Sequence, residues 1–280
     1  MFYLSRSLIQ MKIILNNNSL FKSLRPFSDI GFVPTMGSIH RGHLSLINRS
    51  NRTCKKTIVS IFVNPKQFNN RKDFKNYPKN INNDIKILKK TKKVDFLYIP
   101  KFKDVYNNKK SNIKIIKKDK VLCAKYRKGH FEGVLDVMER LTNLINPKKI
   151  FMGKKDYQQY FLIKNYLKNK HKTSIIPCKT IRDKRKIALS SRNNHLNLNG
   201  IKKASFLSKS LIKLKRNLVN SKKIKQNLRI KIKYFENLLK IKIEYLELRS
   251  IKNLKISNTV RGSRLFVAYY IDNVRLIDNF

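Results

Sequence analysis

Two histidines, His40 and His43, stand three positions apart, directly after an apolar segment. If a helix begins here, residues three apart share a face, so both imidazoles would point to one region. The first turn of a helix carries unpaired N–H groups and the positive end of the helix dipole, which together attract phosphate. Gly42 lies between the histidines and would let a ligand approach closely. The pattern predicts a phosphate-binding site, whereas the plain alternative is a pair of solvent-exposed histidines.

Three other polar segments could add groups to such a site. Residues 153–159, G-K-K-D-Y-Q-Q, offer a lysine for phosphate and a carboxylate for ribose hydroxyls or a metal. Residues 189–193, L-S-S-R-N, combine hydroxyls with a guanidinium, which suits a triphosphate. Residues 64–68, N-P-K-Q-F, carry two neutral amides that could orient a small hydroxy acid. Taken singly, each segment has a plain alternative: residues 153–159 are typical of a charged surface, residues 189–193 of a polar loop, and residues 64–68 of a strand-ending turn. The sequence has neither the H-E-x-x-H spacing of a zinc site nor a Walker loop.

Short apolar runs would position these groups as strands. They cover residues 30–36, 57–65, 94–100, 148–153 and 174–182. Helical patterns separate them, at residues 37–47, at 83–90, and through Val134, Met138, Leu141 and Leu144. Strands that alternate with helices predict an α/β fold with a doubly wound parallel sheet. The carboxyl ends of such strands meet at one edge of the sheet, which is where these sheets bind ligands.

The pattern changes after about residue 182. Two apolar stripes at 3-4 spacing, within 204–218 and 224–239, predict helices whose other faces are rich in lysine. Residues 241–248 alternate as a strand, and two further apolar runs flank Asp272-Asn273, as in a β-hairpin. We therefore expect a smaller α+β domain at the C-terminal end. The chain would divide into residues 1–182 and residues 183–280.

The composition excludes several classes of protein. The 280 residues include 65 Lys and Arg against 16 Asp and Glu, a net charge of +49, and 41% are hydrophobic, enough for a core. Because no run of about 18 apolar residues occurs, we expect no membrane-spanning helix. Three cysteines without C-x-x-C spacing argue against a disulfide framework and favour a reducing compartment. The charge alone favours nucleic-acid binding, but the lysines are spread along the chain rather than clustered, so we interpret most of them as a solvated coat.

Taken in order, the motifs resemble those of the pantoate–β-alanine ligase family, the pantothenate synthetases. The resemblance rests on six motifs and on the closing R-L-I-D-N, and together they span almost the whole chain. The motifs are V-P-T-M-G-S-I-H-R-G-H-L-S-L, V-S-I-F-V-N-P-K-Q-F, K-N-Y-P, R-K-G-H-F-E-G-V, G-K-K-D-Y-Q-Q and A-L-S-S-R-N.

The resemblance implies a two-step reaction. ATP and (R)-pantoate would give pantoyl adenylate and pyrophosphate, and the amine of β-alanine would then displace AMP to form pantothenate. Mg²⁺ would be bound mainly through the phosphates of ATP, with no protein metal ligand expected. The resemblance also implies a Rossmann-like domain of the H-x-G-H nucleotidylyl-transferase type, a hinged C-terminal domain and a cytoplasmic homodimer. Neither nucleic acid nor a membrane is expected as a partner.

The same resemblance assigns the nucleotide side of the site. His43, His40 and Lys155 would be catalytic, with His43 as the proton donor, and both histidines would contact ATP phosphates. Arg127 matches a further nucleotide-side arginine less securely. The other positions expected to bind the triphosphate, ribose or adenine of ATP are Met36, Gly37, Ser38, Ile39, Arg41, Gly42, Gly153, Lys154, Asp156, Ile181, Leu189, Ser190, Ser191 and Arg192.

Three amides would serve the other two substrates. Gln67 and Gln159 would bind pantoate with help from Asn64, and Gln67 also matches the position assigned to β-alanine. Two departures from the family pattern lie close by: Lys66 stands where methionine is usual, and Lys154 replaces a common glutamate. A glycine usual near Ala124 is also missing. None of these departures removes a residue with an assigned role, so we expect activity, at a reduced level if Lys66 disturbs pantoate.

Two other hypotheses remain open at this point. Another adenylyl-transferring enzyme would keep the two histidines and the Ser-Ser-Arg loop but not the pair Gln67 and Gln159. A basic nucleic-acid-binding protein would need a lysine stripe interleaved with aromatic stacking platforms, and the sequence has no such motif.

Overall fold

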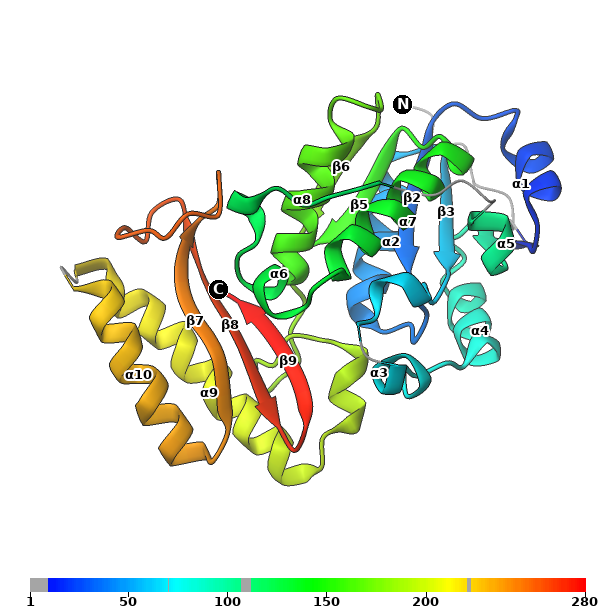
Figure 1. The fold of residues 1–280 in the computed structure, drawn as a ribbon. Coiled ribbons are helices and arrows are strands. Elements are labelled where there is room, and N and C mark those ends of the chain that lie inside the picture. The colour runs from blue at the N-terminus through cyan, green and yellow to red at the C-terminus, as the bar shows by residue number, and fades with distance from the viewer. Residues whose placement is uncertain (1–9, 70, 107–111, 221–222) are drawn as a thin grey trace, which may run out of the picture. The chain divides into compact units, whose positions relative to one another are not determined.

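A computed structural model of the chain describes residues 10–69, 71–106, 112–220 and 223–280 (Figure 1). The first nine residues of the predicted first domain lie outside the described residues. The chain divides into two compact units. Unit 1 comprises residues 1–115, 127–154 and 159–179, and unit 2 comprises residues 116–126, 155–158 and 180–280. The domain boundary predicted near residue 182 stays a prediction, which limited proteolysis would test.

Unit 1 contains a six-stranded sheet in which all neighbouring strands run parallel. In spatial order the strands are β1 (Lys12–Ile14), β4 (Phe96–Tyr98), β3 (Lys56–Ile61), β2 (Ile30–Thr35), β5 (Lys149–Gly153) and β6 (Ser174–Cys178). This confirms the predicted doubly wound sheet of an α/β fold. The strand order reverses at β2, which pairs with β3 on one side and with β5 on the other, so the carboxyl end of β2 is a topological switch point.

Three strand predictions need correction. The edge strand β1 was not predicted, because three residues are too few to show a strand periodicity. Strand β3 ends at Ile61 rather than at residue 65, since Pro65 begins the 3₁₀ turn η1 (Pro65–Gln67). Strand β6 ends at Cys178 rather than at residue 182, because the chain folds back and Arg182 forms an isolated bridge with Ala188.

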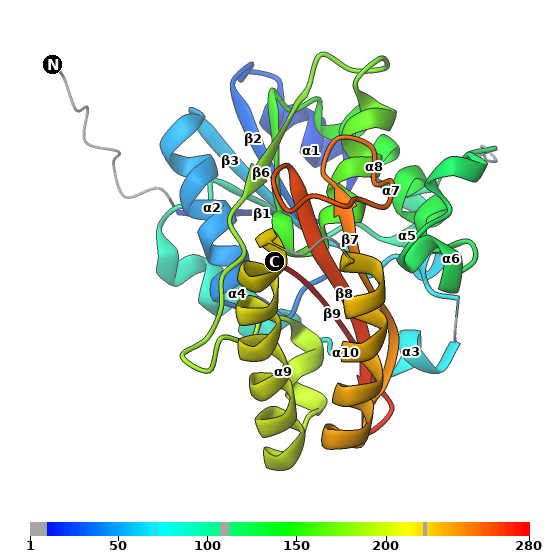
Figure 2. The ribbon, with the colours of Figure 1, turned by 90° about the vertical axis from the view of Figure 1, so that its left-hand side faces the viewer.

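Helices cover both faces of the parallel sheet, as Figure 2 shows. The helices whose bulk lies in this unit are α1 (Asn17–Leu24), α2 (Arg41–Thr53), α3 (Arg71–Lys75), α4 (Ile81–Thr91), α5 (Phe102–Val105), α7 (His130–Ile145) and α8 (Tyr157–Leu167). On one face, α2 and α4 bury apolar side chains in a core that includes Val33 and Val59. Phe32 and Ile58 point to the opposite face because side chains alternate along a strand, and α7 and α8 lie on that side.

Unit 2 is the predicted α+β assembly. Its elements are η2 (Lys117–Asp119), α6 (Cys123–Tyr126), η4 (Ser191–His195), α9 (Leu198–Asn217), η5 (Leu218–Asn220), α10 (Ile224–Leu239), β7 (Lys242–Ser250), β8 (Ser263–Ile271) and β9 (Val274–Asn279). The antiparallel sheet has the order β7-β8-β9, and α9 and α10 lie side by side against one face of it (Figures 1 and 2). The predicted hairpin is confirmed: Asp272 and Asn273 join β8 to β9, and both have a positive φ, as a type I′ turn requires.

Candidate active site

The loop between β2 and α2 lies at the topological switch point of the sheet and is held by one buried carboxylate. Asp84, in the first turn of α4, is 1% exposed and accepts the N–H of Ser38 at 2.8 Å and that of Ile39 at 2.7 Å. The chain bends sharply here, since Gly37 and Ser38 have φ values of +83° and +53°. A side chain at Gly37 would also place its Cβ 2.9 Å from an Asp84 oxygen, so a glycine fits both the bend and the close approach.

The two histidines of the motif cap the helix that follows. His40 is the N-cap of α2, and its Nδ1 accepts the N–H of Gly42 at 3.1 Å. The His43 Nδ1 accepts the N–H of His40 at 3.3 Å, and the two rings stack with their centroids 4.0 Å apart. Because each Nδ1 accepts a backbone N–H, a neutral ring must carry its proton on Nε2. The arrangement therefore gives two Nε2–H donors at a helix N-terminus, where negative charge is favoured.

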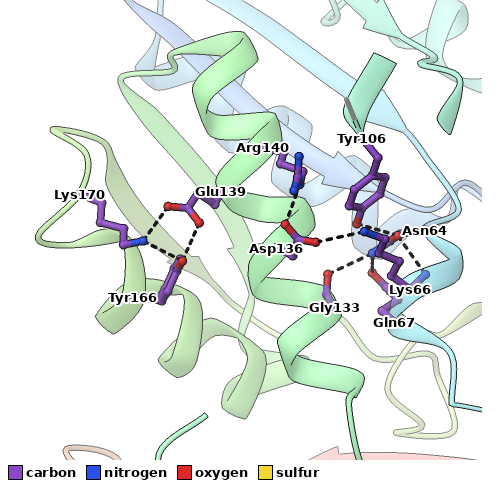
Figure 3. A network of polar contacts seen from close by, with 10 residues as sticks. All are labelled: Asn64, Lys66, Gln67, Tyr106, Gly133, Asp136, Glu139, Arg140, Tyr166 and Lys170. Carbon is purple, nitrogen blue, oxygen red and sulfur yellow. Dashed lines mark hydrogen bonds and ion pairs between the residues drawn. The ribbon is translucent and has the colours of Figure 1, made fainter. Parts of the chain in front are cut away.

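A second polar group gathers where β3 leads into η1 (Figure 3). Asn64, which is 1% exposed, caps η1 and donates through Nδ2 to the Gly133 carbonyl at 3.1 Å and to Gln67 Oε1 at 3.3 Å. Gln67 Nε2 in turn donates to Met36 Sδ at 2.9 Å. This contact brings the 64–68 motif against the first residue of the 36–43 loop.

Helix α7 packs very closely on η1. A Cβ built at Gly133 would lie 2.3 Å from the backbone oxygen of Lys66, so only a glycine allows this approach. Lys66 extends toward Asp136 of α7, with 3.8 Å between Nζ and Oδ2, and its Nζ lies 4.0 Å from the centre of the Tyr106 ring (Figure 3). Its side chain is 44% exposed. The extra cation thus has partners of its own on α7 and at the end of α5.

In unit 2 the predicted triphosphate lysine is held through its backbone. Lys155 and Asp156 lie in η3 (Lys154–Asp156), directly after the last residue of β5, and the Lys155 Nζ pairs with Asp156 Oδ1 at 3.2 Å. The Lys155 carbonyl accepts the side-chain amide of Asn279 at 2.7 Å. The closing R-L-I-D-N motif therefore acts on the segment that carries the predicted lysine.

The Ser-Ser-Arg segment begins a 3₁₀ helix of its own. Ser190 caps η4 and accepts the N–H of Arg192 at 3.4 Å, while Ser191 is buried. The Leu189 N–H donates to the Ile181 carbonyl at 3.0 Å. Ile181, predicted on the adenine side, therefore lies beside the segment that leads into the predicted triphosphate residues 190–192.

The base of that loop is anchored by an ion pair between Arg182 and a buried carboxylate. Arg182 donates to both carboxylate oxygens of Asp278, at 2.6 and 2.9 Å, and to the carbonyl of Asn279 at 3.1 Å. Burial raises the pKa of Asp278 above its ordinary value, and the hydrogen bonds from Arg182 oppose that rise. Such bidentate pairs fix geometry as well as adding energy.

Each unit thus brings together part of the predicted set. Unit 1 holds the 36–43 loop, Asn64, Gln67, Gly153, Lys154 and Gln159, and unit 2 holds Lys155, Asp156, Ile181 and residues 189–192. Sequence reasoning gave no role to five residues that hold these segments: Asp84, Tyr106, Gly133, Asp278 and Asn279. Gly133 lies in the motif R-K-G-H-F-E-G-V, and Asp278 and Asn279 lie in R-L-I-D-N, while Asp84 is an acidic residue in the first turn of a predicted helix. Tyr106 had no local signal.

Two features are absent from the residues that the structure describes. No three or more His, Cys, Asp and Glu side chains in that part of the chain gather so that they could hold a metal ion. Among the helices described, none has both the length and the apolar character needed to cross a membrane.

Comparisons with known proteins agree with the motif order. A family model described as pantoate-beta-alanine ligase matches residues 10–280. The pantothenate synthetase of Flavobacterium psychrophilum is 36% identical over 267 residues, which cover 91% of this chain and 94% of that protein. The pantothenate synthetase of Leptospira interrogans is 41% identical over 258 residues, which cover 89% of each.

Solved structures give the same result. The crystal structure of pantothenate synthetase from Thermus thermophilus matches with a TM-score of 0.86 at 30% identity, covering 96% of this chain and 99% of that one. A pantoate-beta-alanine ligase from Francisella tularensis, crystallised with beta-gamma ATP and beta-alanine, matches with a TM-score of 0.83 at 36% identity, covering 96% and 97%. Of the three hypotheses that the sequence raised, these matches select the first. The chain belongs to the pantoate–beta-alanine ligase family.

Proposed function

We propose that this protein joins (R)-pantoate to β-alanine with ATP, giving pantothenate, AMP and pyrophosphate through pantoyl adenylate. The family match over residues 10–280 carries the proposal. The loop geometry supports it, because a helix N-terminus with two imidazole donors follows the carboxyl end of β2, the topological switch point at which such sheets bind ligands. An amide pair beside the loop suits a small polar acid.

In the first step a carboxylate oxygen of pantoate attacks the α-phosphorus of ATP, and the bond to pyrophosphate breaks. Negative charge builds up on the phosphate oxygens, so fixed donors accelerate the step more than any covalent chemistry by the protein. His40 and His43 donate from Nε2, and His43 supplies a proton to the leaving group. Lys155, Ser190, Ser191 and Arg192 hold the triphosphate, with Arg192 suited to paired contacts with phosphate oxygens.

In the second step the neutral amine of β-alanine attacks the carbonyl carbon of the adenylate. The C–O bond to AMP breaks, the amide bond forms, and the amine loses a proton. Gln67 and Gln159 orient pantoate, Asn64 supports Gln67, and Gln67 also lies where β-alanine must approach. Because a mixed anhydride hydrolyses readily, the site must exclude water until the amine arrives.

The groups assigned to the triphosphate are imidazoles, an amine, hydroxyls and a guanidinium, and none of them is a carboxylate, the protein group that most often binds Mg²⁺. The phosphate oxygens of ATP, which are the hard ligands that Mg²⁺ prefers, would therefore hold the ion together with water. When bound there, Mg²⁺ neutralises triphosphate charge. We further propose that the enzyme is a cytoplasmic homodimer, which sedimentation and cell fractionation would test.

An isotope experiment tests the proposed chemistry. Pantoate carrying ¹⁸O in both carboxylate positions is incubated with ATP, β-alanine and the protein, and the products are analysed by mass spectrometry. An adenylate intermediate transfers one labelled oxygen to AMP and leaves one in the amide of pantothenate. Label in inorganic phosphate, or unlabelled AMP beside pantothenate, would contradict the proposal, and omission of β-alanine should prevent both products from accumulating.

A further inference from the structure

We propose that Tyr106 is a positioning residue for pantoate, which acts through Asn64 to fix the end of the Gln67 amide that faces the substrate. The inference rests on the proposed function, in which Gln67 binds pantoate. Tyr106 follows α5, far from both glutamine motifs in the sequence, and its hydroxyl donates to Asn64 Oδ1 at 2.9 Å (Figure 3).

Two backbone groups identify which end of the Asn64 amide is the oxygen. The Lys66 N–H, which can only donate, lies 3.2 Å from one end of the amide, so that end must be the oxygen. The Gly133 carbonyl, which can only accept, lies 3.1 Å from the other end, so that end must be the nitrogen. The Tyr106 hydroxyl is on the oxygen side and must therefore be a donor.

The same logic extends to Gln67. The Asn64 nitrogen donates to the nearer end of the Gln67 amide at 3.3 Å, so this end must be the oxygen. The nitrogen of Gln67 then lies on the side of the 36–43 loop, where it donates to Met36 Sδ. A substrate atom that meets Gln67 from this side must be an acceptor, which a carboxylate or hydroxyl oxygen of pantoate provides.

The Tyr106 side chain is itself held in place, so it can orient Asn64 and, through Asn64, Gln67. The hydroxyl bond is buried, and the ring is contacted by the Lys66 ammonium, 4.0 Å from its centre, and by the Arg140 guanidinium, 4.8 Å from its centre. Asp136 pairs with both cations, at 3.8 Å to Lys66 Nζ and 2.6 Å to Arg140 Nε. Burial, reinforced by Asp136, raises the pKa of Tyr106 well above its ordinary value, so the hydroxyl keeps its proton at neutral pH.

The chain offers a matched control on the other side of α7. The Tyr166 hydroxyl donates to Glu139 at 2.6 Å, and Lys170, which is 45% exposed, bonds to both residues (Figure 3). None of the hydrogen bonds drawn in this second network leads to Asn64 or Gln67. A Tyr166→Phe change removes the same hydroxyl group and leaves the hydrogen bonds among Tyr106, Asn64 and Gln67 intact.

The test compares Tyr106→Phe with Tyr166→Phe in the full-length protein. For Tyr106→Phe we expect the KM for pantoate to rise by about three- to tenfold, the range typical of one hydrogen bond, while the KM values for ATP and β-alanine change less than about twofold. For Tyr166→Phe we expect all three KM values to stay within about twofold. A loss of thermal stability with unchanged KM values, or an equal rise for all three substrates, would overturn the inference.

A double-mutant cycle then locates the effect. If Tyr106 acts through Gln67, Tyr106→Phe should add less than about 1.5-fold to the pantoate KM in a Gln67→Ala background, because coupled residues are not additive. Full additivity would overturn the inference. Failure of the proposed function would look different, since the unmutated protein would then show no pantoate-dependent reaction at all.

Discussion

The two units hold their share of the predicted site in different ways. In unit 1, the motif side chains bond to backbone groups two or three residues away: His40 to Gly42, His43 to His40, and Asn64 to Lys66. In unit 2, the segments that carry the predicted triphosphate residues are tied to the last strand of the chain. The contact between Lys155 and Asn279 spans 124 positions. The pair of Arg182 and Asp278 spans 96.

This difference explains what each part can tolerate. A site built from local caps keeps its shape as long as its own loop is supported, and Asp84 supports the 36–43 loop of unit 1. A site tied to a distant strand depends on that strand and on the turn that delivers it. A substitution that loosens the 36–43 loop of unit 1 should slow the chemical step. A substitution that frees the unit 2 segments from the last strand should weaken the binding of ATP.

The largest effect should come from Asp84→Asn. An asparagine has one acceptor oxygen, so one of the two loop N–H groups would lose its partner and face an NH₂ group instead. We expect the rate of pantoate-dependent ATP–pyrophosphate exchange to fall at least about tenfold, and the free energy of unfolding to fall by roughly 1–3 kcal/mol. Exchange kinetics and urea denaturation would measure the two effects.

Asp29→Asn is the matched control for this change. Asp29 also accepts a backbone N–H in unit 1, that of Lys55 at 3.1 Å, but it lies outside the loop. We expect its exchange rate to stay within about twofold of that of the unmutated protein. An Asp84→Asn variant as active as this control would show that the carboxylate does not shape the loop.

A smaller effect is expected for Asn279→Ala in unit 2. The change removes the partner of the Lys155 carbonyl and an acceptor for Arg264, so the lysine segment loses its anchor. The KM for ATP should rise by about three- to tenfold, with a smaller change for pantoate. Asn253→Ala is the control, because Asn253 caps an exposed turn in the same unit. A larger effect on pantoate than on ATP would break the distinction between the two units.

The smallest effect should follow Lys66→Met, the exchange that the family resemblance suggests. The Lys66 ammonium is partly exposed, its 3.8 Å contact with Asp136 is long, and Arg140 keeps that carboxylate paired when the lysine is gone. Ion pairs of this kind contribute about 0–1 kcal/mol. We expect kcat and the pantoate KM to change less than about twofold in steady-state assays. A gain of fivefold or more would mean that the extra cation disturbs pantoate.

The same contrast in range explains what could be predicted from the sequence. Five of the six strands of the parallel sheet, the helices α2, α4, α7, α9 and α10 and the Asp272-Asn273 hairpin have periodicities or turn residues of their own, whereas α8 has no clear apolar stripe and was not predicted. Gly37 and Gly42 also mark the loop, because the bend at Gly37 and the bond from the Gly42 N–H to His40 are local features. Strand β1 was missed because its three residues show no periodicity.

The supporting residues could not be predicted because their partners are far away in sequence. Asp84 lies 45 and 46 positions from the loop it holds, and Tyr106 lies 42 positions from Asn64. Only the fold brings these groups together. Gly133 is similar. A glycine is required there because a side chain would clash with the backbone of η1, which is distant in sequence, and not because of anything in its own helix.

The most direct test of the proposed enzyme is ATP–pyrophosphate exchange by the intact protein in the absence of β-alanine. We predict rapid exchange with (R)-pantoate and none without it, because only pantoate can accept the adenylyl group. We also predict that His43→Ala abolishes the exchange while circular dichroism shows an intact fold. Exchange that does not depend on pantoate, or full exchange by a folded His43→Ala variant, would contradict the roles assigned to this site.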